Sequence, residues 1–233
     1  TVSLAKLDNY LCELKEIQIR DGLHVFGVSP NGQQLNDLLV ALTRVSRGSI
    51  DPGDQSLHRA LAEDLCLDFD PLDCVLGEAW NGPKPEELLN DKAWRTNGDT
   101  VERIEVLAAQ LVSGEIIPKD NWPATCAVLN KLNATIRPAV MASGEAELNG
   151  LLTGFDGDFV EPGPSGAPTR GRPEVLPTGR NFYSVDTRMV PTPSAWTLGW
   201  KSASLLVERY MQDHGAYPHN IALSAWGTSN MRT

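Results

Sequence analysis

Four arginines lie close together in a stretch of the chain that is rich in proline and glycine. They are Arg170, Arg172, Arg180 and Arg188, within and just before PEVLPTGRNFYSVDTRMVPTPSAW. Guanidinium groups bind carboxylates through paired hydrogen bonds, and proline fixes a backbone at low entropy cost. Such a loop would present its arginines as rigid anion-binding groups. A loop of this length is usually functional or disordered, and composition alone does not decide between the two.

The charge balance limits the partners of the chain. Its 233 residues include 20 Lys and Arg against 30 Asp and Glu, which gives a net charge of −10. Phosphate contacts need clustered cations, so this balance argues against non-specific binding of nucleic acid or of an anionic membrane. It leaves room for a local basic pocket such as the arginine-bearing loop. The 41% hydrophobic and 21% charged residues predict a packed core.

Targeting signals and cysteine usage both indicate a cytoplasmic protein. No stretch approaches the roughly 20 apolar residues that span a bilayer. The first residues, TVSLAKLDNYL, lack the basic region and apolar run of a signal peptide. The four cysteines form no C-x-x-C pair, which predicts reduced, buried thiols at Cys12, Cys66, Cys74 and Cys126.

Several common catalytic motifs are absent from the sequence. There is no G-x-x-x-x-G-K-[ST], so no P-loop would hold ATP on this chain, and there is no G-x-S-x-G or H-E-x-x-H. His214 and His219 are separated by Pro218 and do not share a helix face. The scattered histidines and cysteines form no recognisable zinc site.

Apolar spacing predicts helices along most of the first 152 residues. Steps of three and four define a helix that ends near Gly22, and its buried face would hold Leu4, Leu7, Leu11, Leu14 and Ile17. A second helix would begin at Ser29 and Pro30 and end at Gly48, with a buried stripe of Leu35, Leu38, Leu39, Leu42 and Val45. Further helices are predicted at 54–65, 100–112, 122–141 and 144–152.

The composition of the sequence changes at Thr153, after which glycine and proline are frequent. Helical spacing returns in TPSAWTLGWKSASLLVERYMQDHG, whose inward positions would be Trp196, Trp200, Ala203, Leu206, Val207 and Tyr210. HNIALSAWG then has the composition of a buried strand. A helix, a tight turn and an apolar strand resemble the start of an α/β unit.

These patterns predict a mainly α fold with a Pro/Gly-rich loop region and the start of an α/β unit, an α+β class. We expect three regions: helical 1–152, an irregular arginine-bearing loop region at 153–191, and a helix plus strand at 192–233. The chain starts inside a helical pattern and stops just after the predicted strand. It is therefore expected to be an internal piece of a longer polypeptide.

Two blocks carry a family resemblance. YLCELKEIQIRDGLHVFG and PEVLPTGRNFYSVDTRMVP, the latter continuing to AWGTSNMRT, resemble the large subunit of aerobic cobaltochelatase, of the CobN type. That family includes the large subunit of magnesium chelatase. The blocks are long and in the expected order, whereas the helices between them resemble the family more loosely. The PTGRNFYSVD segment is closer to the cobalt branch.

The resemblance implies a specific activity. Such a subunit binds the tetrapyrrole hydrogenobyrinic acid a,c-diamide and inserts Co²⁺, which is the substrate metal. Two partner subunits of the AAA+ motor type supply ATP hydrolysis, and the missing P-loop agrees with that division of labour. Under this resemblance the partners are the motor subunits and the corrinoid precursor, with neither nucleic acid nor membrane.

The resemblance also suggests substrate-binding residues. Corrinoid precursors carry several carboxylates, so we expect contacts from Arg180, Asn181, Tyr183 and Arg170. Arg180 would alternatively brace the loop by bonding backbone carbonyls. The three tryptophans Trp196, Trp200 and Trp226 would stack on a macrocycle, or would belong to the core.

Removal of the two pyrrole protons needs a base, which is a carboxylate or a histidine. We expect His24 with Asp21, and Glu16, to act as proton or metal relay groups. The alternatives are a packed imidazole at a capped helix end for His24, and a solvated i,i+4 pair with Arg20 for Glu16. Asp186 is either a base or a turn-former. No first-shell metal ligand is identifiable from the sequence.

Two further functions are open on sequence grounds. The region is alternatively a non-catalytic docking scaffold for the motor subunits, with its acidic helices facing a basic patch. It is alternatively part of the Mg²⁺ and protoporphyrin IX branch of the same family.

Overall fold

A computed structural model describes residues 25–48, 50–183, 190–225 and 227. Its α-helices are α2 (Gly32–Arg44), α3 (Leu57–Asp64), α4 (Asn97–Ser113), α5 (Pro123–Lys131), α6 (Arg137–Phe155) and α7 (Pro193–His214). Its shorter turns are η1 (Pro52–Asp54), η2 (Glu86–Leu88), η3 (Leu132–Ile136), η4 (Pro168–Arg170) and η5 (Pro173–Val175). The strands β1 (Pro162–Pro164) and β2 (Asn181–Tyr183) form a parallel pair with Gly163 opposite Phe182. The predicted mainly α class with a small α/β element is confirmed.

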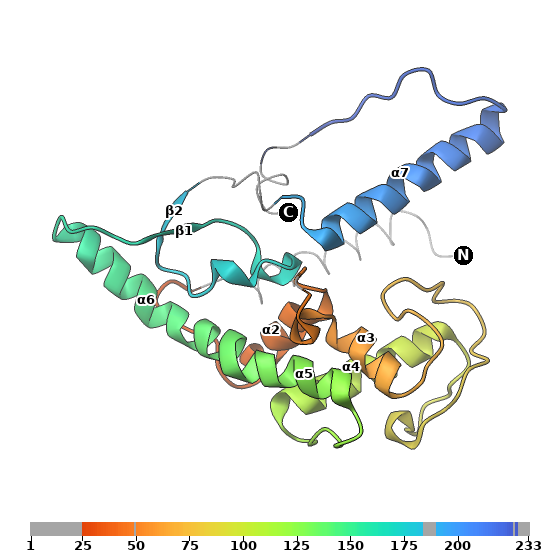
Figure 1. The fold of residues 1–233 in the computed structure, drawn as a ribbon, viewed down its shortest axis with the longest axis horizontal. Helices are drawn as coiled ribbons and strands as arrows, with labels where there is room; N and C mark the ends of the chain where they lie inside the picture. Colours follow the sequence, from red (N-terminus) through yellow and green to blue (C-terminus); the bar gives the residue numbers. More distant parts are fainter. Residues whose placement is uncertain (1–24, 49, 184–189, 226, 228–233) are drawn as a thin grey trace, which may run out of the picture.

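The hydrophobic core lies where α2, α3, α4 and α5 pack together (Figure 1). Its fully buried side chains include Leu39, Leu57, Leu61, Ile104 and Val128. Asp64, the last residue of α3, accepts hydrogen bonds from the backbone N–H groups of Ala124 at 3.3 Å and Thr125 at 2.7 Å. A side chain from α3 thus satisfies the first turn of α5, whose own N-cap, Trp122, cannot.

Side-chain caps set the helix ends that the apolar pattern placed only approximately. α4 begins at Asn97 rather than at residue 100, because Thr96 and Asp99 form a reciprocal capping box. α3 begins at Leu57 rather than at residue 54, because Ser56 accepts from the N–H of Arg59. The prediction that Ser29 caps α2 was wrong. Its hydroxyl donates to the carbonyl of Met141 and accepts from the N–H of Gly144 instead.

One continuous helical segment replaces two predicted helices. Residues 123–155 run through α5, the π-helical turn η3 and α6 without a break. In the π turn the N–H of Arg137 donates to the carbonyl of Leu132, five residues earlier. α6 reaches Phe155, so the loop region begins later than residue 153. The predicted break at residues 142–143 is not observed. The missing side chain of Gly144 permits a close contact with Ser29.

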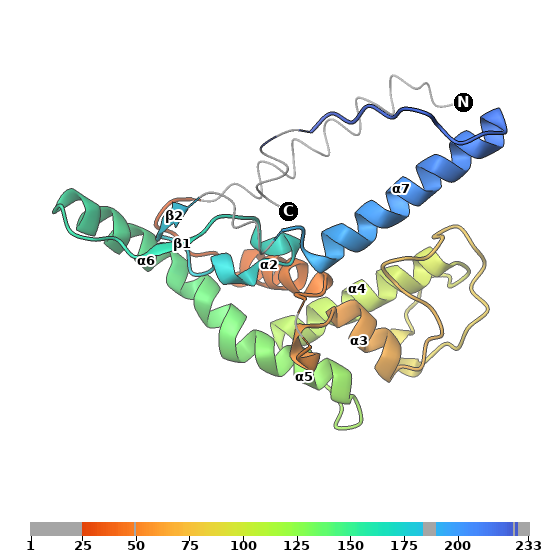
Figure 2. The ribbon, with the colours of Figure 1, turned by 45° about the horizontal axis from the view of Figure 1, so that its top comes forward.

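α7 projects away from the helical core (Figures 1 and 2). The prediction that one face of this helix is buried was wrong, because none of its residues is buried. Its first turn contacts the segment just after α2, where the Ser194 hydroxyl donates to the carbonyl of Ser46. Helical spacing reports that apolar residues share a face; it does not report whether another element covers that face.

The predicted buried strand after α7 was also wrong for the residues that the structure describes. Residues 219–225 form no strand and are exposed. A strand needs a neighbour to pair with, and no described segment pairs with this one. The two strands lie instead at the two ends of the arginine-bearing region.

The three described thiols are free but less buried than predicted. Cys66 is exposed, Cys74 and Cys126 are half-buried, and Cys12 lies outside the described residues. Among the described residues, no helix is long and apolar enough to cross a membrane.

His58 makes the stability of the core sensitive to pH. The residue is fully buried, and its ring nitrogens have no hydrogen-bond partner in the described part of the chain. Burial, and secondarily the positive charge of Arg44, lowers the pKa of His58 to about 4. The unfolded chain takes up a proton near pH 6.5, whereas the folded chain does not until about pH 4. His58 therefore does not lower the free energy of unfolding above pH 6.5, and it lowers this free energy progressively as the pH falls from 6.5 to about 4.

We expect a loss of about 2 kcal/mol at pH 5 from this residue, at roughly 1.4 kcal/mol per pH unit. Urea unfolding at pH 7 and pH 5 measures the loss. His58→Leu should flatten the dependence, and the same change at exposed His219 should leave it intact. An unchanged slope in His58→Leu would assign the pH dependence to other groups.

Candidate functional site

The arginine loop, residues 161–183, lies along α6 (Figure 1). Pairing of β1 with β2 closes the loop at its two ends, and the N–H of Asn181 donates to the carbonyl of Glu161 at 2.9 Å. Between the strands, η4 packs against α2 and η5 follows it. The described part of the loop is thus an ordered element with defined neighbours.

A buried carboxylate joins the arginine loop to the segment before α2. Glu147 is only 4% exposed on α6. Its Oε2 accepts from the backbone N–H of Gly27 at 2.8 Å, and its Oε1 accepts from the hydroxyl of Thr178. We call this arrangement the Glu147 bridge. Gly27 ends the first block of the family resemblance and Thr178 lies in the second, so the two blocks meet at one side chain.

Close backbone approach supports the bridge. A Cβ on Gly150 of α6 would lie 2.2 Å from the carbonyl oxygen of Gly179, and one on Gly179 would lie 2.4 Å from the carbonyl of Ala146. Gly179 also has φ of +88°, a conformation that favours glycine. The N–H of Thr178 donates to the Ser143 hydroxyl at 3.2 Å. These contacts need small residues on one face of α6.

The structure places Arg180 against its own loop. Its Nη2 donates to the carbonyl of Glu174 at 2.7 Å and its Nε to the carbonyl of Pro177 at 3.2 Å. These bonds are those of the loop-bracing alternative. Asn181 and Tyr183 follow on β2, where both are exposed. Alternate strand residues share a face, so these two side chains lie on one side of β2.

Arg170 and Arg172, the other two described arginines of the loop, differ in burial. Arg170 is exposed at the end of η4, away from β2 in the chain. Arg172 is only 1% exposed, and its Nε donates to a carboxylate oxygen of Glu174 at 2.8 Å. Neither of its terminal nitrogens has a partner among the described residues. Sequence reasoning selected Arg170 and Arg180 as substrate-binding residues, but it did not predict the burial of Arg172, because burial leaves no local pattern in a loop.

The predicted catalytic residues His24, Asp21 and Glu16 lie outside the described residues, as do Asp186, Arg188 and Trp226. Gly27, which the Glu147 bridge holds, lies only three positions after His24 in the sequence. The described residues contain no cluster of three or more His, Cys, Asp or Glu that would hold a metal ion.

Sequence reasoning missed Glu147 and its neighbours. The sequence predicts only a short helix at 144–152 in this part of the chain. Its spacing of Ser143, Gly144, Glu147 and Gly150 was the available signal, because those steps of one, three and three put small residues and one carboxylate on one helix face.

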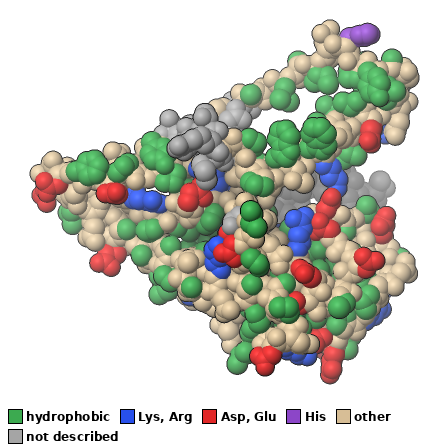
Figure 3. Space-filling view, viewed as in Figure 1, with side chains coloured by type: hydrophobic (Ala, Val, Ile, Leu, Met, Phe, Trp, Pro, Cys, Tyr) green, Lys and Arg blue, Asp and Glu red, His purple; other side chains and the backbone are tan. Residues whose placement is uncertain are grey.

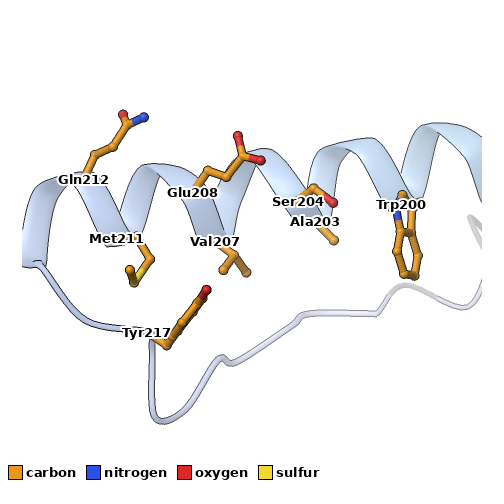
Figure 4. Close-up of a pocket in the computed structure, with 8 residues that line it drawn as sticks. All are labelled: Trp200, Ala203, Ser204, Val207, Glu208, Met211, Gln212 and Tyr217. Carbon is orange, nitrogen blue, oxygen red and sulfur yellow. The ribbon is translucent and has the colours of Figure 1, made fainter.

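An open groove lies along α7, apart from the arginine loop. Apolar side chains gather over this helix on the face seen in Figure 3. Tyr217 folds back toward it, and an open groove of about 590 Å³ lies between them (Figure 4). Its lining includes Trp200, Val207 and Met211. Trp196 and Trp200 lie with ring centroids 6.0 Å apart and are 59% and 67% exposed. The predicted core role of these two tryptophans is therefore wrong.

Comparison with known proteins identifies the family. A family model described as CobN/Magnesium Chelatase matches residues 1–233. The aerobic cobaltochelatase subunit CobN of Sinorhizobium sp is 59% identical over 251 residues, covering 99% of this chain and 20% of the relative. The subunit of the same name from Pseudomonas aeruginosa is 52% identical over 235 residues, covering 99% of this chain and 19% of the relative.

A solved structure, the catalytic subunit of cobaltochelatase from Mycobacterium tuberculosis, matches with a TM-score of 0.65 and 33% identity. The match covers 91% of this chain and 16% of that one. The chain spans about a fifth of the length of the curated relatives that it matches. The resemblance noted from the two sequence blocks is confirmed, and the chain belongs to the CobN/magnesium chelatase family.

Proposed function

We propose that this region is the tetrapyrrole-binding part of an ATP-dependent cobaltochelatase, which inserts Co²⁺ into hydrogenobyrinic acid a,c-diamide during cobalamin biosynthesis in the cytoplasm. The observation that carries the proposal is 59% identity to a CobN subunit along nearly the whole chain. ATP hydrolysis belongs to partner subunits of the AAA+ type.

The arginine loop supplies the groups that the substrate requires. Exposed Arg170, Asn181 and Tyr183 offer a guanidinium, an amide and a hydroxyl to the carboxylates and amides of the corrinoid. Arg180 holds the loop in shape through its bonds to two backbone carbonyls, and its remaining N–H groups are donors for the substrate. His24, Asp21 and Glu16 are the proposed proton and metal relay groups.

The proposal is tested by titrating the full-length subunit with hydrogenobyrinic acid a,c-diamide and, separately, with protoporphyrin IX, followed by visible absorbance. We expect saturable binding of the corrinoid precursor and at least tenfold weaker binding of the porphyrin. Tighter binding of protoporphyrin IX would assign the region to the magnesium branch. Binding of neither would contradict a tetrapyrrole site.

A docking role has one observation in its favour, which is the uncovered apolar face of α7. Corrinoid affinity and chelation rate, measured together, distinguish the two functions. Trp200→Ser in the full-length subunit should leave corrinoid affinity unchanged if α7 binds a motor subunit, while the chelation rate at saturating corrinoid should respond less to added motor subunits. If α7 contacts substrate, the affinity itself falls.

A further inference from the structure

We propose that Glu147 is a positioning residue of the tetrapyrrole site: its buried carboxylate fixes the arginine loop relative to the segment before α2. This inference rests on the proposed function. It concerns two chain segments far apart in sequence, and the described hydrogen bonds of the Glu147 side chain reach both of them.

The chemistry of the bridge favours a carboxylate. Both oxygens of Glu147 act as acceptors, one for a backbone N–H and one for a hydroxyl. Hydrogen bonds to an ionised group are about twice as strong as neutral ones. A carboxylate that is 4% exposed requires such partners, because its burial without them is costly. The bridge therefore holds only while both segments stay in place.

The surrounding contacts make the bridge a junction between three elements. One turn before Glu147, the Ser143 hydroxyl accepts from the N–H of Thr178, so two successive turns of α6 hold the same loop residue. On the other side, Ser29 bonds both the carbonyl of Met141 and the N–H of Gly144. Residues 27–29 and 178–179 are thus both fixed to the same face of α6.

The junction lies next to the proposed substrate groups. Thr178 is two residues before Arg180 and three before Asn181, the first residue of β2. Gly27 is three residues after His24. An error of about 1 Å in the placement of binding or catalytic groups has a large effect on rate. A side chain that touches neither substrate nor metal would consequently affect binding and catalysis through these two segments.

The experiment uses the full-length subunit with Glu147→Gln, Thr178→Val and, as a matched control on α6, Glu145→Gln. Glu145 is exposed and lies two positions earlier on the helix. Gln retains the shape of Glu but offers only one acceptor oxygen, so it can satisfy only one of the two donors. Thr178→Val removes the loop-side donor at nearly constant volume.

Three quantities are measured: the dissociation constant for hydrogenobyrinic acid a,c-diamide, the melting temperature, and amide hydrogen exchange in the free protein. We expect Glu147→Gln to weaken corrinoid binding roughly 10- to 150-fold, because the corrinoid would then have to order the two segments at a cost comparable to the lost charge-assisted hydrogen bond. Amide exchange should rise in residues 25–29 and 176–181 together, while protection of α2 to α5 stays unchanged. Thr178→Val should give the same pattern on the loop side.

Unchanged exchange in both segments of Glu147→Gln would overturn the proposal, as would faster exchange throughout the core, which indicates general destabilisation. Thr178→Val keeps the test valid if Glu147→Gln does not fold. If the wild-type subunit binds no tetrapyrrole, the proposed function fails, and the exchange pattern still decides whether Glu147 positions the two segments. If exchange rises in both segments of Glu147→Gln but the corrinoid affinity is normal, Glu147 positions the segments and has no role in binding.

Discussion

Gly179→Ala should detach the arginine loop from α6. The new Cβ would lie 2.4 Å from the carbonyl of Ala146, a backbone group that cannot rotate away. The residue also has φ of +88°, which costs a non-glycine residue roughly 1–2 kcal/mol. Overpacking adds typically 1–3 kcal/mol, so we expect local destabilisation of about 2–5 kcal/mol. The measurement is exchange of the Thr178 amide, with the corrinoid dissociation constant in the full-length subunit.

Gly157→Ala is the matched control for this prediction. Gly157 has a similar φ of +81° and lies just after α6, but a Cβ there would meet nothing within 4 Å. The substitution therefore carries the backbone cost without the close contact. Equal effects of the two changes would show that the approach of Gly179 to Ala146 is unimportant and that only backbone strain matters.

Arg180→Ala should loosen the loop before any ligand is present. The guanidinium bonds the carbonyls of Glu174 and Pro177 at 2.7 and 3.2 Å. A hydrogen bond from a charged donor contributes about 1.5–3 kcal/mol. Loss of even one of the two bonds should therefore lower the protection of residues 174–180 against amide exchange by one to two orders of magnitude. Arg180→Lys retains the charge and can reach one carbonyl, and it should give an intermediate result.

Arg170→Ala should show the opposite pattern. Arg170 is exposed, and its side chain makes no hydrogen bond in the described part of the chain. Its loss should leave the exchange of the free loop unchanged and weaken only corrinoid binding. If Arg180→Ala also leaves free-loop exchange unchanged but weakens binding, Arg180 contacts the substrate directly rather than acting as a brace.

The parts of the fold that the sequence predicted well are those governed by local rules. Of the predicted apolar stripe on α2, Leu35, Leu39 and Leu42 are buried, and Leu38 and Val45 are half-buried. α4 lies within three residues of its predicted start, and its true start follows from Thr96 and Asp99, a capping pair that is visible in the sequence. Helix periodicity and caps depend on neighbours within a few positions, so a single sequence contains them.

The parts that were missed depend on contacts between distant segments. Nothing near Glu147 reports that its partners include Gly27 and Thr178, at separations of 120 and 31 positions. Arg172 and Arg180 look equivalent in sequence, yet one is almost fully buried and the other braces the loop. The face of α7 was predicted to be covered because amphipathic spacing usually implies burial. In each case the deciding information is tertiary.

The π turn at Leu132–Ile136 accommodates one residue without changing the direction in which the rest of the helix faces. An α-helix advances about 1.5 Å and turns about 100° per residue, and a π turn contains one residue more than the α turn it replaces. The extra residue is taken up within the turn, so α6 keeps nearly the angular phase of an uninterrupted α-helix that is one residue shorter. If the same five residues became regular α-helix, everything beyond them would rotate by about 100°. That rotation would carry Glu147 away from Gly27 and Thr178 while the α5 core stays packed.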